Sequence, residues 1–179
     1  RYSLRNFNVG LYKLELKGED FYLRGYTTQE RSGDSYISSI LGAYVNEKSK
    51  SSTAWLPQYI GTYVGARLNP AVTEDQAHAA ARNAADAGRV LPGSSQFETF
   101  ASEVKSTFIS ENDLTKCVYG AKFNDKSNLY HYEGMYNFNN SLNNLVEFQV
   151  GASARRYDLN SGGTIFDDLA RDIKIDEYA

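Results

Sequence analysis

The chain has 179 residues, of which 41% are hydrophobic, 23% charged and 13% aromatic, which is enough for one ordinary domain. Its net charge of −3 has the wrong sign for a dedicated nucleic-acid-binding protein, and its single cysteine excludes an intrachain disulfide and a cysteine-rich zinc site. No stretch reaches the roughly 18 consecutive apolar residues of a membrane-spanning helix. Because the chain opens Arg1-Tyr2-Ser3 without a methionine, we expect a mature protein or an internal fragment.

The first thirty residues predict two strands around a tight turn. Apolar and polar side chains alternate with a period of two from about Ser3 to Leu16 and again from Phe21 to about Glu30. Gly18 lies among charged neighbours between the two runs, which is typical of a short hairpin. We expect residues 1–31 to form this hairpin.

Residues 32–126 carry helical signals instead. Apolar residues recur at helical spacing after a possible cap at Asp34, and Pro57 is tolerable only in the first turn of its helix. Thr73 to Gln76 forms a capping box, and Ser95 with Glu98 predicts a second one. We therefore expect a largely helical insertion, far longer than the usual loop of about 4–6 residues.

Alternation returns in residues 127–179. One strand is predicted around Leu129–Phe138, a polar turn at residues 139–144, and the clearest alternation of the chain at Val146–Arg155. A second irregular stretch at residues 156–172 precedes a final strand that starts at Ile173. The connections between strands thus alternate short and long.

This order favours an all-β membrane barrel, of which the chain would supply about five antiparallel strands and a helical extracellular insertion. Outer-membrane barrels have short turns on one side and long loops on the other. Faces built from Val, Phe, Leu, Ala and Gly suit lipid, and small residues such as Gly25, Gly134, Ala152 and Ala154 would leave a soluble core poorly packed. A soluble antiparallel sheet with one wet face gives the same period, so patterning alone leaves both alternatives open.

Three segments add a resemblance to a known family. They are Phe21–Tyr36, Gly120–Ser127 leading into Tyr130–Gly134, and Phe148–Ser153 followed by Asn160–Phe166. They resemble barrel strands entering outer loops in TonB-dependent outer-membrane receptors of the SusC-like, Bacteroidetes type, and the likeness follows this order over most of the chain. Such receptors are usually several times longer, with a plug domain and a segment that contacts TonB, neither of which is recognisable in this sequence.

The resemblance implies part of a transporter that imports an oligosaccharide, peptide or chelate across the outer membrane of a Gram-negative bacterium. It also implies several partners: the remainder of the barrel and its plug, the TonB complex through that plug, a SusD-like surface lipoprotein, the nutrient ligand and membrane lipid. No nucleic acid, no cofactor and no enzymatic activity is expected.

Candidate contact residues follow from the wet faces of the strands and from the long insertion. Lumen-facing side chains with possible substrate contact are Tyr22, Arg24, Tyr26, Glu133, Glu147, Gln149 and Arg155. In the insertion, Trp55, Tyr59 and Tyr63 lie four residues apart on one helical face, either to stack on a cargo or to pack within the insertion. Most of the lumen-facing set would be wall contacts to a plug.

Metal and catalytic signals are weak. Asp158, Asn160, Asp167 and Asp168 could gather oxygen ligands for calcium, as could Asn124, Asp125 and Asn128, but neither set has an EF-hand spacing, and solvated loop side chains are the simpler interpretation. His131, on the wet face beside Glu133, and His78, in an alanine-rich helix, are not expected to be ligands. No catalytic residue is predicted, because Cys117 has no histidine near it in the sequence and no Gly-x-Ser-x-Gly motif is present.

The main alternative function is a soluble or cell-surface β-rich carbohydrate-binding module with a helical insertion, and a glycan-degrading enzyme ranks behind it. The two leading hypotheses differ over the apolar side chains of the strands. They contact lipid in the first and lie in a protein core in the second.

Overall fold

The structure, a computed structural model, describes residues 1–139 and 146–179. It divides into two compact units. One contains residues 37–107 and 111–122 together with Arg1, and the other contains residues 2–36, 108–110 and 123–179. Over the described residues the fold is mixed α/β, with four α-helices and a five-stranded antiparallel sheet.

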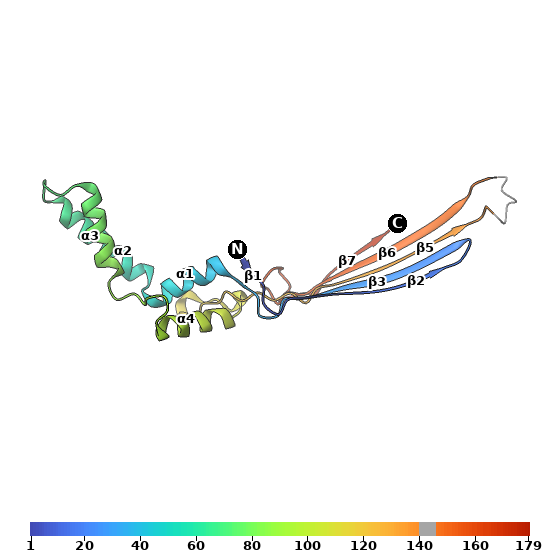
Figure 1. Ribbon diagram of the computed structural model, residues 1–179, viewed down its shortest axis with the longest axis horizontal. Coiled ribbons are helices and arrows are strands. Elements are labelled where there is room, and N and C mark those ends of the chain that lie inside the picture. The colour runs from blue at the N-terminus through green and yellow to red at the C-terminus, as the bar shows by residue number, and fades with distance from the viewer. Residues whose placement is uncertain (140–145) are drawn as a thin grey trace. The chain divides into compact units, whose positions relative to one another are not determined.

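The sheet has the strand order β2-β3-β5-β6-β7, so strands that follow one another along the chain lie side by side (Figure 1). Its bounds are β2 Asn8–Lys17, β3 Phe21–Arg31, β5 Asn128–Asn137, β6 Gln149–Leu159 and β7 Ile173–Tyr178. Two short strands, β1 (Tyr2–Ser3) and β4 (Tyr36–Ile37), form a separate two-stranded sheet. The expectation of about five antiparallel strands is confirmed.

The all-β barrel class needs correction. Among the described residues β2 and β7 lie at opposite edges and do not pair with each other, so the sheet is open and no closed barrel is present. The helices also make up too much of the chain for an all-β class. The two-residue period predicts strands, but whether a sheet closes depends on what pairs with its edges, which a local pattern does not contain.

The register confirms how the predicted strand faces were divided. Leu14 pairs with Gly25, which pairs with Tyr132, which pairs with Ala154, so these four side chains lie on one face of the sheet. The pairs one position further along, such as Glu15 with Arg24 and Arg24 with Glu133, lie on the other face, because successive side chains of a strand alternate between faces. The strand predicted from Val146 begins at Gln149, although Phe138 N–H still donates to the carbonyl of Phe148 just before it. Of the turn predicted at residues 139–144, residues 140–144 lie outside the described part of the chain.

The other unit holds the helical insertion. Its helices are α1 Ser38–Ser49, α2 Ser52–Arg67, α3 Glu74–Asp86 and α4 Ser95–Ser106, followed by two 3-10 turns at Ile109–Glu111 and Leu114–Lys116. α2 packs on α3 and α1 on α4. The small core includes three alanines spaced by four on α3, together with Val45 and Val104. Alanine at these positions lets the α3 backbone lie close to α2.

The predicted helix ends are partly right. The capping box is present, because Thr73 accepts from the Gln76 N–H and the Gln76 side chain accepts from the Thr73 N–H. The second box is wrong at Ser95, since the N-cap of α4 is Ser94, which accepts from Phe97 N–H.

Two further helix expectations are wrong. Asp34 does not cap α1, which begins at Ser38 without a side-chain cap, and its carboxylate accepts from the Asn6 side-chain amide instead. Pro57 is the sixth residue of α2 and so lies beyond the first turn. Because proline has no N–H, it leaves the Thr53 carbonyl without its usual helical donor.

Gly33 lies where the chain leaves β3, and its backbone is left-handed with φ of 60°. A side-chain carbon at this position would lie 2.7 Å from the Arg5 carbonyl oxygen and closer still to that of Asn6. Only glycine avoids both this overlap and the unfavourable backbone.

We expect Gly33→Ala to destabilise the sheet-containing unit by more than about 1 kcal/mol, because both conformation and packing oppose the added carbon. Thermal unfolding followed by circular dichroism measures the effect. Gly42→Ala in α1 is the matched control, since a side chain there meets no atom within 4 Å. Equal unfolding temperatures for the two variants would contradict this account of Gly33.

Candidate functional site: two faces of an open sheet

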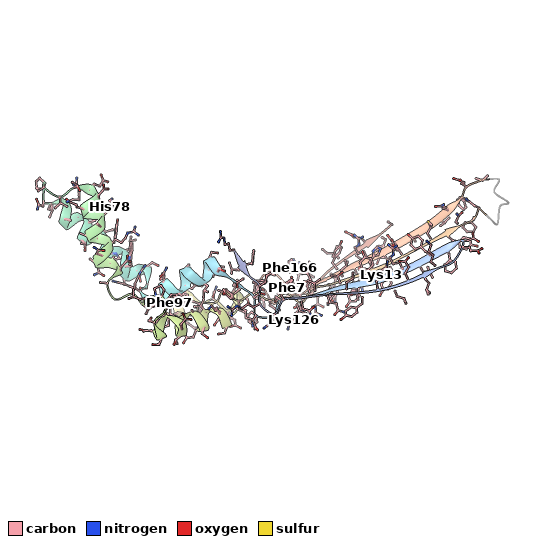
Figure 2. All side chains as sticks on the ribbon, viewed as in Figure 1. Phe7, Lys13, His78, Phe97, Lys126 and Phe166 are labelled. Atoms are coloured by element: carbon pink, nitrogen blue, oxygen red, sulfur yellow. The ribbon has the colours of Figure 1, made fainter. Side chains whose placement is uncertain are left out.

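The polar face of the sheet carries a ladder of charged side chains that crosses all five strands. We define the charge ladder by its residues, which are Lys13, Glu15, Arg24, Glu133, His131, Arg155 and Glu177. Lys13, labelled in Figure 2, stands at the β2 end of it. The strand register places these residues opposite or diagonal to one another, so each lies within reach of a partner on its own or the next strand.

Positively and negatively charged side chains alternate along the ladder from β2 to β5. Lys13 Nζ lies 2.6 Å from a Glu15 carboxylate oxygen, and the same oxygen accepts from Arg24 Nε at 3.1 Å. Arg24 Nη1 in turn lies 2.8 Å from a carboxylate oxygen of Glu133 on β5. Arg24 therefore links the acidic side chains of β2 and β5.

The ladder is most enclosed at its middle strand. His131 is 5% exposed, and its ring lies 4.7 Å from that of Tyr26 between ring centroids. Arg155 Nε donates to His131 Nδ1 at 3.3 Å, so the ring proton belongs on Nε2, which faces a Glu133 oxygen at 3.4 Å. Arg155 then contacts Glu177 on β7 at 3.4 Å. A face built this way requires water or polar partners above it, because partly exposed charges cannot be transferred cheaply into an apolar layer.

The other face is apolar and exposed over the half of the strands nearest the β2–β3 turn. We define the apolar face by Leu14, Leu16, Leu23, Gly25, Gly134, Val150, Ala152 and Ala154. Leu14 is 70% exposed, Leu16 56% and Leu23 53%. Monomeric soluble proteins rarely leave a contiguous apolar surface of this kind uncovered.

Aromatic side chains border the apolar face at both ends. Near the turns lie Phe21, Tyr136, Phe138 and Phe148, with the Phe138 ring 4.6 Å from Tyr136 and 5.5 Å from Phe148 between centroids. At the loop end lie Tyr12, Tyr130, Tyr132 and Tyr178. On β6 and β7 the same face is charged from the level of Tyr130 onward, with Arg156 and Asp176 in that row and Asp158 and Lys174 in the next. The apolar residues therefore form a band with an aromatic border on either side.

The structure places most of the predicted lumen set on the charge-ladder face. Tyr22, Arg24, Tyr26, Glu133, Gln149 and Arg155 share that face, while Glu147 lies before β6 begins. Sequence reasoning did not select Lys13, Glu15, His131 or Glu177 as site residues. The alternation of the strands puts these four residues on the polar face, and this was the sequence signal that could have selected them. Only the strand register shows that they contact one another.

The insertion aromatics pack against a neighbouring helix. Trp55 stacks on Tyr59 with centroids 4.9 Å apart and donates from Nε1 to Asp86 at 2.7 Å. Tyr63 stacks on His78 of α3, labelled in Figure 2, with centroids 4.5 Å apart. All three predicted aromatics are half-buried, so their rings serve first to join α2 and α3.

The calcium candidates do not gather into one site. Among the described residues, no three His, Cys, Asp or Glu side chains come together as metal ligands would. Asp168 is engaged by protein donors: its carboxylate accepts from the N–H groups of Gly162 and Gly163 at 3.0 and 2.6 Å and from the Ser161 hydroxyl at 2.8 Å. Asp167 is exposed, Asp158 lies within β6, and Asn160 follows that strand.

The other three candidates lie at the loop end of β5. Asn124 is bonded through its backbone to the Thr164 hydroxyl, Asp125 accepts from the Ser127 N–H, and the Asn128 side chain accepts from Arg31.

None of the described helices is long and apolar enough to cross a membrane.

Comparisons with known proteins found no relative of this chain. No family model matches the chain, no curated protein matches it, and no solved structure matches it. The site is therefore interpreted from its own residues.

Asp168 gives the second prediction. Burial would raise the pKa of its carboxyl, but the hydrogen bonds from residues 161–163 outweigh that and lower the pKa to about 2 from an ordinary 3.8. A lowered pKa adds stability that is fully present above the ordinary value and is lost as the pH falls through about 2.

We expect amide hydrogen exchange to show protected Gly162 and Gly163 N–H groups near pH 4 and loss of that protection by about pH 2. Asp168→Asn should expose both amides at either pH, and Asp167→Asn is the neighbouring control. Equal protection in parent and Asp168→Asn would show that the carboxylate does not hold the loop.

Proposed function

We propose that this chain forms part of the wall of an outer-membrane transporter of the TonB-dependent receptor kind. The apolar face contacts lipid, and the charge ladder faces the water-filled passage through which a nutrient is imported. The chain performs no catalysis in this proposal. The resemblance of its strand-to-loop segments is what points to this family in particular.

The observation that carries the proposal is the opposite character of the two faces of one open sheet. Lipid-facing bands of membrane barrels are apolar with aromatic girdles at both interfaces, and their interiors are polar. Tyr130 and Phe138, at the two borders of the band, lie eight residues apart, or about 27 Å along an extended strand. With the usual strand tilt this gives a height of about 20 Å, close to the roughly 25 Å expected.

The edges of the sheet indicate what else the wall needs. In the described part of the chain, β2 and β7 each offer one row of backbone N–H and C=O groups that no further strand covers. Such groups are too costly to leave unpaired in hydrocarbon. The remainder of the barrel is therefore the first partner in this proposal, a plug inside it the second, and the TonB complex acts through that plug.

The helical insertion joins β3 to β5 and is placed on the outer side by the rule that long loops are extracellular. There it would contact cargo or a surface lipoprotein of the SusD kind. Because the side chains of Trp55, Tyr59 and Tyr63 pack against α3, we assign cargo contact first to Tyr22, Tyr26 and the charge ladder.

A carbohydrate-binding module would need a cover for the apolar face. Buried apolar side chains supply most of the stability of a soluble domain, and Leu14, Leu16 and Leu23 are more than half exposed here. The exposed band favours the membrane wall over that alternative.

Lipid contact is testable with a pair of adjacent residues. In a Cys117→Ser background, we expect an environment-sensitive dye on Leu14→Cys to be quenched by brominated lipids in vesicles. The same dye on Lys13→Cys should not be quenched, because its side chain is on the opposite face. A monodisperse, detergent-free monomer with no quenching at either position would exclude the membrane proposal.

A charge on the apolar face tests the same proposal energetically. Val150→Arg should weaken insertion into vesicles by about 2–4 kcal/mol if this residue lies near the bilayer midplane. Ser153→Arg on the polar face should insert as the parent does. Co-flotation with vesicles measures both, and equal flotation of the two variants would contradict the assignment of faces.

A further inference from the structure

One side of α2 is apolar and exposed along its whole length. Leu56, Ile60 and Val64 recur every four residues, with Leu68 directly after the helix, and these four side chains are between 51% and 81% exposed. The aromatic side of the same helix packs on α3 (Figure 1). Although the whole of α2 is described, none of its residues is buried. Because a surface helix normally turns its apolar stripe toward a core, this exposed stripe indicates an external contact.

The stripe has the form of a ridge beside an open groove. Side chains four residues apart form ridges on a helix surface, and the row next to this ridge consists of Pro57, Gly61 and Gly65. A side-chain carbon added at either glycine would meet no atom within 4 Å, so the space above both is open. A second helix can place a ridge of its own in such a groove, and this is the commonest way in which helices pack in globular proteins.

We propose that α2 binds α2 of a second copy of this chain, antiparallel and across a two-fold axis at the level of Thr62. The ridge of each copy then lies in the glycine groove of the other. Ile60 meets Val64 of the partner subunit, and the axis repeats this contact. The inference does not depend on lipid contact by the sheet, and it assigns a partner that the proposed function does not include.

The shape of the face favours a second copy over a different partner. Ridge and groove lie side by side on one helix, so the surface is complementary to itself, as an isologous two-fold contact requires. The four apolar residues are evenly spaced, so each remains opposite another when the helix direction is reversed. From Ser52 to Ala66 the helix has no charged residue, and two copies therefore meet without like-charge repulsion while a charged partner finds no counter-charge.

The charges at the ends of α2 favour the antiparallel direction. Arg67 is the last residue of the helix, and at the other end the Glu47 carboxylate accepts from the Ser52 N–H at 2.9 and 3.1 Å. Antiparallel pairing brings the positive end of one helix to the negative end of the other. Parallel pairing would instead place like charges together, which is unfavourable.

The size of the face predicts a weak dimer. α2 has 16 residues and is therefore about 24 Å long. Two helices that cross at about 50° touch only over their middle turns, which is less than the roughly 800 Å² per partner of a standard interface. We therefore expect a reversible dimer with a Kd above about 10 μM.

The test is sedimentation equilibrium of the full chain, with Cys117→Ser to prevent disulfide dimers, in an uncharged detergent that matches the buffer density. We expect a concentration-dependent monomer–dimer equilibrium. Gly61→Leu fills the groove and should weaken dimerisation by about tenfold or more, whereas Gly42→Leu in α1 should change it by less than about twofold. Gly42 is the matched control, because a side chain there also meets no atom within 4 Å.

Two complementary charges test the direction of pairing. Ile60→Lys and Val64→Glu should each weaken self-association by about tenfold or more, because each puts a charge against an apolar residue of the partner copy. An equimolar mixture of the two variants should dimerise again, since opposite charges then meet at one of the two equivalent contacts and the other contact is unchanged.

Each other outcome overturns the proposal. A monomer at every concentration excludes a second copy as the partner of α2. Equal dimerisation of the parent, Gly61→Leu and Val64→Glu shows that the chain associates elsewhere, as through the edges of the sheet. A mixture that does not recover refutes the antiparallel contact of residues 60 and 64. Circular dichroism checks that each variant folds, and Gly65→Leu replaces Gly61→Leu if the latter does not.

Discussion

The structure depends on one constraint: a single sheet must satisfy two different surroundings on its two faces. Arg24 bridges Glu15 and Glu133 on one side, while Leu14, Leu23 and Val150 are exposed on the other. Charges that are paired yet open need a wet neighbour, and exposed leucines need an apolar one. The proposed wall of a membrane transporter meets both needs at once, since it places water and lipid on opposite sides of the same strands.

The same constraint gives the small residues their role. A soluble sheet with Gly25, Gly134 and Ala152 at its centre would be poorly packed against a second layer. In the proposed membrane wall those positions would face fluid acyl chains and would cost little. The loop-end tyrosines then stand where an apolar surface changes to a charged one, which suits a ring with one apolar and one polar end.

The helical insertion obeys different rules from the sheet. Its stability comes from local caps and from aromatic stacking between α2 and α3, with Trp55, Tyr59, Tyr63 and His78 forming one continuous contact. Its helices need no help from the strands to acquire their caps, because those bonds join residues three apart. Long loops built this way can carry recognition while the sheet carries the wall.

The sequence by itself determined the strand faces, the helical insertion and the Thr73 cap, because alternation and capping are properties of neighbouring residues. It misplaced the start of α1, because Asp34 accepts from the distant Asn6 amide instead of capping the helix. It also put the cap of α4 on the wrong one of two adjacent serines and Pro57 in the wrong turn of α2. The charge ladder was decided by tertiary structure alone. Glu133 reaches Arg24 only after about a hundred intervening residues bring β5 beside β3, and a one-residue slip in that register would move each side chain to the opposite face.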